Sequence, residues 1–266
     1  GLTRLETVRA SRAGADQRRG RAGRTEPGVC YRLWDEPQTA SLESYTRPEI
    51  LSADLSSLVL DLAHWGATDP STLAFLDPPP VPALTEARNL LRELNALDEA
   101  GRITPEGNSL RALALPPRLA RMIVDSHRFG SGDDAAMIAA ILTERGLGGD
   151  SADLDARLDN FRRDRSQRAQ SARQLAERWA KQVAANEPFD VKDRSLSTGL
   201  MLALAFPDRV ARNRGNGSFV LANGRGASVE QTSVLAKSPY IAVAELTGTA
   251  ANGRILLAAP IAQLEI

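Results

Sequence analysis

The spacing of apolar residues changes at Pro207, and this change constrains the fold more than any other feature. Before Pro207, apolar residues recur at three- and four-residue spacing, which is typical of helices that pack on a core. After it, short apolar runs follow one another, with Asn-Gly turn signals between several of them. The runs are 218–222, 227–230, 240–246 and 254–259, and the Asn-Gly pairs begin at Asn216, Asn223 and Asn252. The chain is therefore predicted to be mainly α, with a β-rich C-terminal part that suits a small barrel.

Helical periodicity accounts for most of the chain between residues 48 and 206. The clearest pattern predicts one helix over 48–65. Further helices are expected over 84–97, 105–113, 117–144 as two helices, 152–185 with a polar interruption, and 196–206. Prolines at positions 78–80 and 82 separate the first two patterns, because they lack a backbone donor and bias their neighbours toward extended conformations. Between 45 and 115, a short ribbon near Ile103 completes an order of helix, helix, ribbon and helix that fits a winged-helix module.

Composition excludes several kinds of site. The 33 basic and 33 acidic residues cancel, so any nucleic-acid contact must come from local clusters. Cys30 is the only cysteine, and His64 and His127 are the only histidines. This leaves no internal disulfide, no expected metal site and almost no material for a Ser-His-Asp triad. With no run of eighteen apolar residues and no signal-peptide core, we expect a cytoplasmic protein without a membrane partner.

The most demanding chemistry lies near the start, in Gln17-Arg18-Arg19-Gly20-Arg21-Ala22-Gly23-Arg24. Four arginines on a backbone with two glycines can place planar guanidinium groups on a phosphate. Gln17 can both accept and donate a hydrogen bond, which suits the positioning of a water beside a terminal phosphate. We expect a short helix over 15–21 with Asp16 as its N-cap and Gly23 at its end. An isolated segment of this kind would more often be a flexible coat for nucleic acid.

This octet and several later segments resemble one family. Every fixed position matches Q-R-x-G-R-A-G-R, which is motif VI of the superfamily 2 helicases of the DEAH/RHA type. Segments 28–34, 46–50 and 75–79 are also similar to that family, and segments 206–211 and 221–227 are similar to its bacterial HrpB branch. The resemblance therefore reaches both ends of the chain. Together with Gly1 in place of an initiator methionine, it suggests a piece of a longer polypeptide.

The resemblance implies a domain order. The four parts are the end of the second RecA-like helicase domain with motif VI over 1–44, a winged-helix domain over 45–115, a ratchet-like helical bundle over 116–206, and an incomplete OB-like barrel over 207–266. Within the first part, Val29, Tyr31 and Leu33 alternate with other side chains and predict a strand. That strand would belong to a RecA-like sheet of which this chain holds only a remnant.

The resemblance also assigns roles near the start. Arg21 and Arg24 would be arginine fingers that neutralise charge developing on the γ-phosphoryl group of ATP, and Gln17 would orient the lytic water or the phosphate. These three residues are thus the expected catalytic and ATP-binding residues of a full-length ATP-dependent RNA helicase, whose cofactors are ATP and Mg²⁺. The chain contains no G-x-x-x-x-G-K-[ST] motif. We therefore expect it to bind neither cofactor and to be inactive without the missing RecA-like domains of the same polypeptide.

A second helicase-like stretch is rejected. Asp98-Glu99-Ala100-Gly101 differs by one letter from the D-E-A-H motif of helicases. It follows an amphipathic helical pattern, whereas the magnesium-binding acid of such a motif belongs at the tip of a hydrophobic strand.

A second group of arginines lies between residues 157 and 181. It consists of Arg157, Arg162, Arg163, Arg165, Arg168, Arg173 and Arg178, against Asp159, Asp164 and Glu177. One interpretation is a solvated helix face with salt bridges at four-residue spacing. The other is a surface that tracks the phosphates of single-stranded RNA, with salt-sensitive binding. For that surface the candidates are Arg157, Arg162, Arg163, Arg165 and Arg168, and single-stranded DNA stays open, since only the family name specifies RNA.

A function of a different class remains open as well. The winged helix, the bundle and the barrel could form a non-enzymatic RNA-binding or protein-docking module, because a fold alone does not decide function. The two hypotheses differ in what Arg21 and Arg24 do. Replacing either should abolish ATP turnover in the full-length protein only if the helicase hypothesis is correct.

Overall fold

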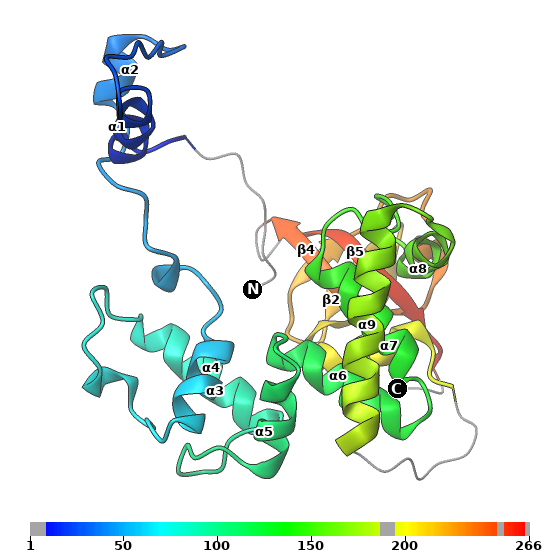
Figure 1. The fold of residues 1–266 in the computed structure, drawn as a ribbon. Coiled ribbons are helices and arrows are strands. Elements are labelled where there is room, and N and C mark those ends of the chain that lie inside the picture. The colour runs from blue at the N-terminus through cyan, green and yellow to red at the C-terminus, as the bar shows by residue number, and fades with distance from the viewer. Residues whose placement is uncertain (1–8, 187–194, 249–252, 264–266) are drawn as a thin grey trace.

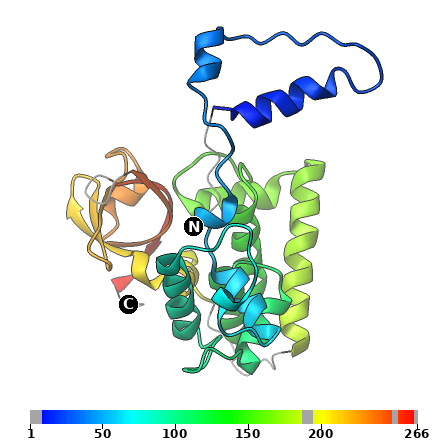
Figure 2. The same ribbon diagram turned by 90° about the vertical axis from the view of Figure 1, so that its left-hand side faces the viewer.

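The computed structural model describes residues 9–186, 195–248 and 253–263. Figure 1 shows an N-terminal segment with α1 and α2 that extends away from a group of helices, and a small barrel packed on that group. Figure 2 shows the barrel and the helices side by side, with the N-terminal segment projecting beyond both. The predicted combination of a helical majority and a β-rich C-terminal part is confirmed in this coarse form.

The helices follow most of the predicted ranges. They are α1 Arg12–Arg21, α2 Glu36–Ala40, α3 Ser56–His64, α4 Val81–Glu93, α5 Pro105–Ala112, α6 Pro117–Arg128, α7 Gly132–Thr143, α8 Leu154–Arg163, α9 Gln167–Asn186 and α10 Thr198–Ala205. Short 3-10 turns lie at η1 Glu49–Leu51, η2 Pro70–Thr72, η3 Pro207–Arg209 and η4 Val234–Lys237. The expected interruption of 152–185 falls between α8 and α9, where Asp164 Oδ1 accepts from the Ser166 N–H at 2.8 Å. That contact competes with continued helix formation.

The helix predicted over 48–65 is shorter than expected. Only Ser56–His64 is α-helical, after the separate turn η1. Asp54 Oδ1 accepts from the Ser56 N–H at 2.8 Å, so a side chain takes up a backbone donor just before α3. The apolar spacing was correct for the part that packs on the core, but it did not reveal this break.

The ribbon expected near Ile103 consists of an isolated antiparallel bridge between Leu97 and Ile103. Between them, Asp98 Oδ1 accepts from the Arg102 N–H at 2.8 Å and its other oxygen pairs with Arg102 Nε at 2.9 Å. The stretch 98–101 is therefore a tight turn closed by its own aspartate, which agrees with its rejection as a magnesium motif.

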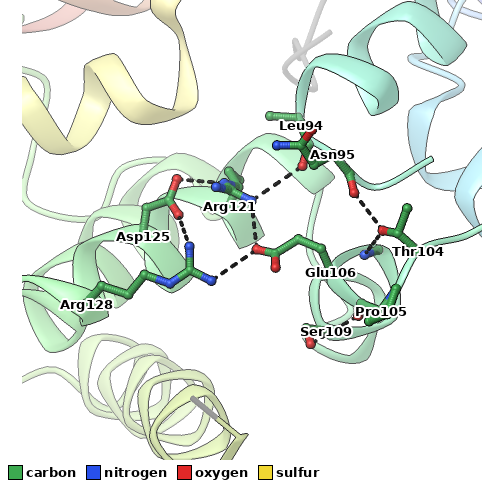
Figure 3. Close-up of polar contacts among 10 residues, drawn as sticks. Leu94, Asn95, Thr104, Pro105, Glu106, Ser109, Arg121, Asp125 and Arg128 are labelled. Carbon is green, nitrogen blue, oxygen red and sulfur yellow. Dashed lines mark hydrogen bonds and ion pairs between the residues drawn. The ribbon is translucent and has the colours of Figure 1, made fainter. Parts of the chain in front are cut away.

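A network of charged side chains joins α5 to α6 (Figure 3). Arg121 donates to Glu106 Oε1 at 2.7 Å and to Asp125 Oδ2 at 2.6 Å. Arg128 reaches the same two carboxylates at 3.4 and 3.0 Å. Each carboxylate bridges two arginines, and Arg121 and Asp125 are largely removed from solvent. The network therefore fixes the orientation of α5 on α6.

The main core runs through α3 to α10 and continues onto one face of the barrel. Fully buried Leu91, Leu110, Ile123, Ile138 and Phe161 are among its members. Helices α6, α7, α9 and α10 pack around it (Figure 1). The predicted helices of this region formed because their apolar residues recur on one face and meet the same core.

The barrel is closed by five strands in the order β1-β2-β3-β5-β4. The strands are β1 Val210–Gly215, β2 Ser218–Leu221, β3 Gly226–Ser228, β4 Tyr240–Gly248 and β5 Gly253–Ile261. β3 pairs with β5 in parallel and the other pairs are antiparallel. β1 was not predicted, because polar side chains such as Arg212 and Asn213 hide its alternation. The predicted Asn252-Gly253 turn falls partly outside the described residues.

Residues 241–244 of strand β4 are buried on both faces, which explains why this part of the strand is continuously apolar. Ile241 and Val243 point into the barrel core, whereas Ala242 and Ala244 join the main core against the helices. α10 lies across β4 and β5 so closely that a Cβ on Gly199 would stand 2.0 Å from the Pro260 carbonyl oxygen. This contact sets the position of the barrel on the bundle.

The N-terminal segment differs from the rest because it has almost no core. Among described residues before Leu55, Ala15 is the only buried hydrophobic residue. The strand predicted around Val29, Tyr31 and Leu33 is wrong: the segment is irregular, and these side chains are 74%, 85% and 96% exposed. A strand needs a hydrogen-bonding neighbour, and the described part of the chain offers none here.

Candidate functional site

The candidate site lies at the end of helix α1. Ser11 is its N-cap, and the Ser11 hydroxyl accepts from the Gly14 N–H at 3.1 Å. The predicted N-cap Asp16 is therefore wrong, since the helix begins a turn earlier. Arg18, Arg19 and Arg21 lie in its last turn, where cations interact favourably with the helix dipole. The arginine cluster thus sits on a helix end that its charge stabilises.

The predicted site residues lie together at this end. Gln17 and Arg21 are one helical turn apart and so share a face of α1, and Arg24 follows in the turn after the helix. All three side chains are exposed. None makes a side-chain hydrogen bond or ion pair with another described residue, whereas Arg19 lies 3.9 Å from Asp16. Their hydrogen-bonding groups face open solvent.

Asp16 has a different role from the one predicted. Its carboxylate pairs with Arg32 Nη2 at 2.5 Å, which ties the returning chain to α1. Gly28 makes the return possible, because a Cβ there would stand 1.8 Å from the Ala22 carbonyl oxygen. Sequence reasoning missed this contribution of Asp16, Gly28 and Arg32. The only signal was that Gly28 and Arg32 belong to a segment similar to the helicase family.

The N-terminal end of α1 is anchored on a later segment. The N–H groups of Arg12 and Ala13 donate to the carbonyls of Glu43 and Ser44 at 2.8 and 3.0 Å. Arg12 also donates to the Ser44 hydroxyl at 2.7 Å. The helix is therefore held at its start, while the face with Gln17 and Arg21 stays open.

The two glycines inside the octet are not needed for contacts within the described chain. A Cβ on Gly20 would have no neighbour within 4 Å, and one on Gly23 would meet only ordinary van der Waals contacts. Glycine in a helix interior is less stable than alanine by about 1 kcal/mol. The folding of this chain gives no reason for Gly20.

The arginines of α8 and α9 divide into two groups. Arg162 pairs with Asp134 at 2.7 Å, Arg168 pairs with Glu144 at 2.5 Å, and Arg157 donates to the Ser151 carbonyl at 2.7 Å. These side chains brace α8 and α9 against the segments before them. The ion pairs of Arg162 and Arg168 join different elements. The predicted pairs at four-residue spacing within one helix therefore explain few of these contacts.

Arg173 is also held, since it donates to the Phe161 carbonyl at 2.6 Å. Arg163, Arg165 and Arg178 are less constrained. Arg163 donates to the Asp159 carbonyl of its own helix at 3.1 Å. Arg165 and Arg178 are exposed and make no side-chain ion pair or hydrogen bond with a described residue. Of the five candidates for nucleic-acid contact, Arg163 and Arg165 are thus the ones whose charge is least neutralised.

The described residues contain no cluster of three or more His, Cys, Asp or Glu side chains that could hold a metal ion. In the part of the chain that is described, no helix combines the length and the apolarity needed to cross a lipid bilayer.

Comparison with known proteins identifies relatives over the whole chain, although no family model matches it. The chain is 42% identical over 261 residues to the ATP-dependent RNA helicase HrpB of Escherichia coli, which covers 97% of this chain and 31% of that protein. It is 39% identical over 142 residues to the human probable ATP-dependent RNA helicase DHX34, covering 53% of the chain and 12% of that protein.

Solved structures give the same result. The crystal structure of the E. coli DExH-box NTPase HrpB matches with a TM-score of 0.77 and 35% identity over 100% of this chain and 32% of that one. A crystal structure of the E. coli DEAH/RHA helicase HrpB matches with a TM-score of 0.77 and 36% identity, over 99% and 32%. This chain thus corresponds to about a third of the length of HrpB. Over nearly its whole length, this chain is homologous to part of HrpB, which the second of these structures describes as a DEAH/RHA helicase.

Proposed function

We propose that this chain is the C-terminal part of an ATP-dependent RNA helicase and that α1 supplies its arginine fingers. One observation carries the proposal: Gln17, Arg21 and Arg24 share an exposed end of α1 and have no polar partner among the described residues. A guanidinium group without an internal partner is available for a phosphate that approaches from outside. The homology with HrpB supports ATP as the source of that phosphate.

The arrangement fits the phosphate end of ATP but not the magnesium ion. The described residues offer guanidinium and amide groups at the α1 end, with open space around Gly20, and no cluster of acidic ligands. Bound with Mg²⁺ by other domains of the longer protein, ATP would supply the phosphoryl group to be hydrolysed. Arg21 and Arg24 neutralise charge that develops on this group, and Gln17 holds a water or a phosphate oxygen.

The domain order remains part of the proposal. The coreless N-terminal segment supports a RecA-like remnant over 1–44, since its exposed apolar residues need a covering surface. The order α3, α4, bridge and α5 supports a winged helix over 45–115, and the packing of α6 to α10 supports a ratchet-like bundle over 116–206. The closed five-stranded barrel supports an OB-like domain over 207–266.

We also propose that single-stranded RNA runs along the helical and barrel parts. Arg163, at the end of α8, and Arg165, just after it, can bind a phosphate without giving up an ion pair. Arg157, Arg162 and Arg168 can do so only by exchanging partners within the chain. The polypeptide's own RecA-like domains would be the second partner.

The test is Arg21→Ala in the longer protein. We expect RNA-stimulated ATP hydrolysis to fall by about 10³- to 10⁵-fold, the contribution of an arginine finger in related enzymes. RNA affinity should change little, because Arg21 contacts the nucleotide in this proposal. Arg19→Ala is the matched control: it removes an arginine of the same helix, at the variable position of the octet, that already lies near Asp16. Equal hydrolysis by the Arg21→Ala variant and the unaltered protein would refute the proposal.

A further inference from the structure

A cavity lies where the α3–α4 region, the start of α6 and the barrel meet. Its volume is about 620 Å³, well within the range of sites for small organic ligands. Four arginines from different parts of the chain line it: Arg118, Arg145, Arg209 and Arg225. Neither the α1 site nor the arginines of α8 and α9 belong to this cavity, and its four arginines come from separate parts of the sequence.

Two of the arginines form a fixed wall. Arg118 donates to Asp208 at 2.8 Å and to the Ala205 carbonyl at 3.1 Å, and Arg209 donates to the Ala244 carbonyl at 2.8 Å. Both guanidinium groups lie over the ring of Phe206. Burial lowers the pKa of Arg209, and the charges of Arg118 and Arg225 act in the same direction. Several cations are thus held close together, which favours an anion beside them.

Arg225 is the cation of this group whose side chain has no polar partner among the described residues. Its Nε is buried and makes no hydrogen bond, and its side chain makes no ion pair with a described residue. A buried charged donor left unsatisfied is unfavourable by several kcal/mol as a general rule. Its position on the cavity wall lets a bound anion satisfy it.

Carboxylates also line the cavity and restrict the kind of ligand. Besides Asp208, they include Asp54, Glu86 and Glu245. Glu245 is half-buried, makes no ion pair or side-chain hydrogen bond with a described residue, and lies at an irregularity of the β4–β5 pairing. Such bulges redirect side chains and are frequent beside functional sites. An ionised carboxylate only accepts hydrogen bonds, so a simple anion is disfavoured and a ligand with both phosphate and hydroxyl groups is favoured.

We propose that this cavity binds one phosphate-bearing ribonucleotide unit, with Arg225 on the phosphate and Glu245 on a ribose hydroxyl. Leu51, Leu55 and Leu246 provide an apolar wall for the base or the sugar. A carboxylate that binds ribose hydroxyls distinguishes RNA from DNA. The proposal rests on the proposed function for its preferred source, a single strand of RNA, but a free nucleotide carries the same chemical groups.

The first experiment measures binding of short fluorescent oligoadenylates, RNA and DNA, to the 266-residue chain at several salt concentrations. For Arg225→Gln we expect RNA affinity to fall about tenfold or more, since a hydrogen bond to a charged group is lost. The dependence of log affinity on log salt should weaken by about 0.7, the value for one phosphate contact on a single strand. For Glu245→Gln, RNA binding should weaken while DNA binding stays unchanged.

Arg254→Gln is the matched control. Arg254 is an exposed barrel arginine paired with Glu230 at 2.8 Å, and it does not line the cavity. This variant should keep both the affinity and the salt dependence. The thermal midpoint of Arg225→Gln should not fall, because the side chain has no described partner to lose. Unchanged RNA binding by Arg225→Gln, or an equal loss in the control, would overturn the proposal, as would equal losses of RNA and DNA binding in Glu245→Gln.

A second titration with adenosine monophosphate identifies the source. If the monophosphate binds and Arg225→Gln abolishes this, the cavity takes free nucleotides; if only the oligonucleotide shows the Arg225 effect, it takes a strand. Either result supports a ribonucleotide site. Neither experiment involves ATP hydrolysis, so failure here is distinguishable from failure of the arginine-finger proposal, which Arg21→Ala tests separately.

Discussion

Gly20 and Gly28 lie eight positions apart and have opposite surroundings. Around Gly20, on the exposed end of α1, a Cβ would meet no atom within 4 Å. Around Gly28, the chain returns so closely that a Cβ would overlap the Ala22 carbonyl. Gly28 is therefore explained by this chain's own fold. Gly20 has no such explanation, which suggests that it leaves space for a group outside the described residues.

We predict effects of opposite sign for Gly20→Ala and Gly28→Ala in the 266-residue chain. Gly20→Ala should stabilise α1 by about 1 kcal/mol and slow local amide exchange roughly fivefold. Gly28→Ala should speed that exchange. The added methyl group forces the segment around Gly28 away from Ala22, which separates Arg32 from Asp16. Hydrogen exchange followed by mass spectrometry measures both. Faster exchange of α1 in Gly20→Ala would show that Gly20 has a structural role here after all.

At the scale of elements, the position of α10 on β5 depends on one close approach. Gly199 faces the Pro260 carbonyl oxygen, and a Cβ there would also lie 2.8 Å from the Ile261 side chain. α10 packs on both β4 and β5 and also on α6. The close approach of Gly199 to Pro260 therefore affects how α10 holds the barrel against α6.

We predict that Gly199→Ala lowers the unfolding free energy by about 1–3 kcal/mol, the usual penalty of overpacking a core. For a protein of this size, that corresponds to a fall in the thermal midpoint of about 2–4 °C per kcal/mol. Differential scanning calorimetry measures it. Gly20→Ala is the control, since it adds the same methyl group where nothing lies nearby. An unchanged midpoint for Gly199→Ala would mean that α10 can shift on β5 without loss.

The elements also show what a sequence can and cannot predict. Helices such as α4, α6 and α9 were predictable because their apolar spacing is local and every turn repeats it. The strand expected around Tyr31 failed because pairing depends on a neighbour that periodicity does not reveal. β1 was missed for the opposite reason, since its pairing with β2 and β4 overrides a polar sequence.

The candidate sites differ in the same way. That Gln17, Arg21 and Arg24 lie together on α1 was predictable, because they are close in the sequence. The cavity was not, because Arg118, Arg209 and Arg225 come from α6, the turn before β1 and the loop between β2 and β3. Only the packing of the barrel on the bundle brings them together. Local motifs are therefore readable from a sequence, while convergent sites require the fold.

At the scale of the whole molecule, the two proposed sites differ in how much buried core lies around them. The cavity is enclosed by parts that share the main core, whereas α1 belongs to the projecting segment with Ala15 as its one buried hydrophobic residue among those described before Leu55 (Figure 2). Exposed Tyr31, Leu33 and Tyr45 on that segment are apolar surface without a described partner. In the proposed function, the other RecA-like part of the longer protein covers them and brings ATP to Arg21.

This dependence leads to the last prediction: the 266-residue chain alone should hydrolyse no ATP. An arginine finger accelerates hydrolysis only when the phosphate and the metal ion are already held in place. The sequence has no glycine-lysine phosphate loop, and none of its three lysines follows a glycine. In an assay with radiolabelled ATP and Mg²⁺, release of phosphate should equal the blank, with and without RNA. Turnover that persists in Arg21→Ala would point to a contaminating enzyme, but turnover that Arg21→Ala abolishes would mean that this chain forms a complete site.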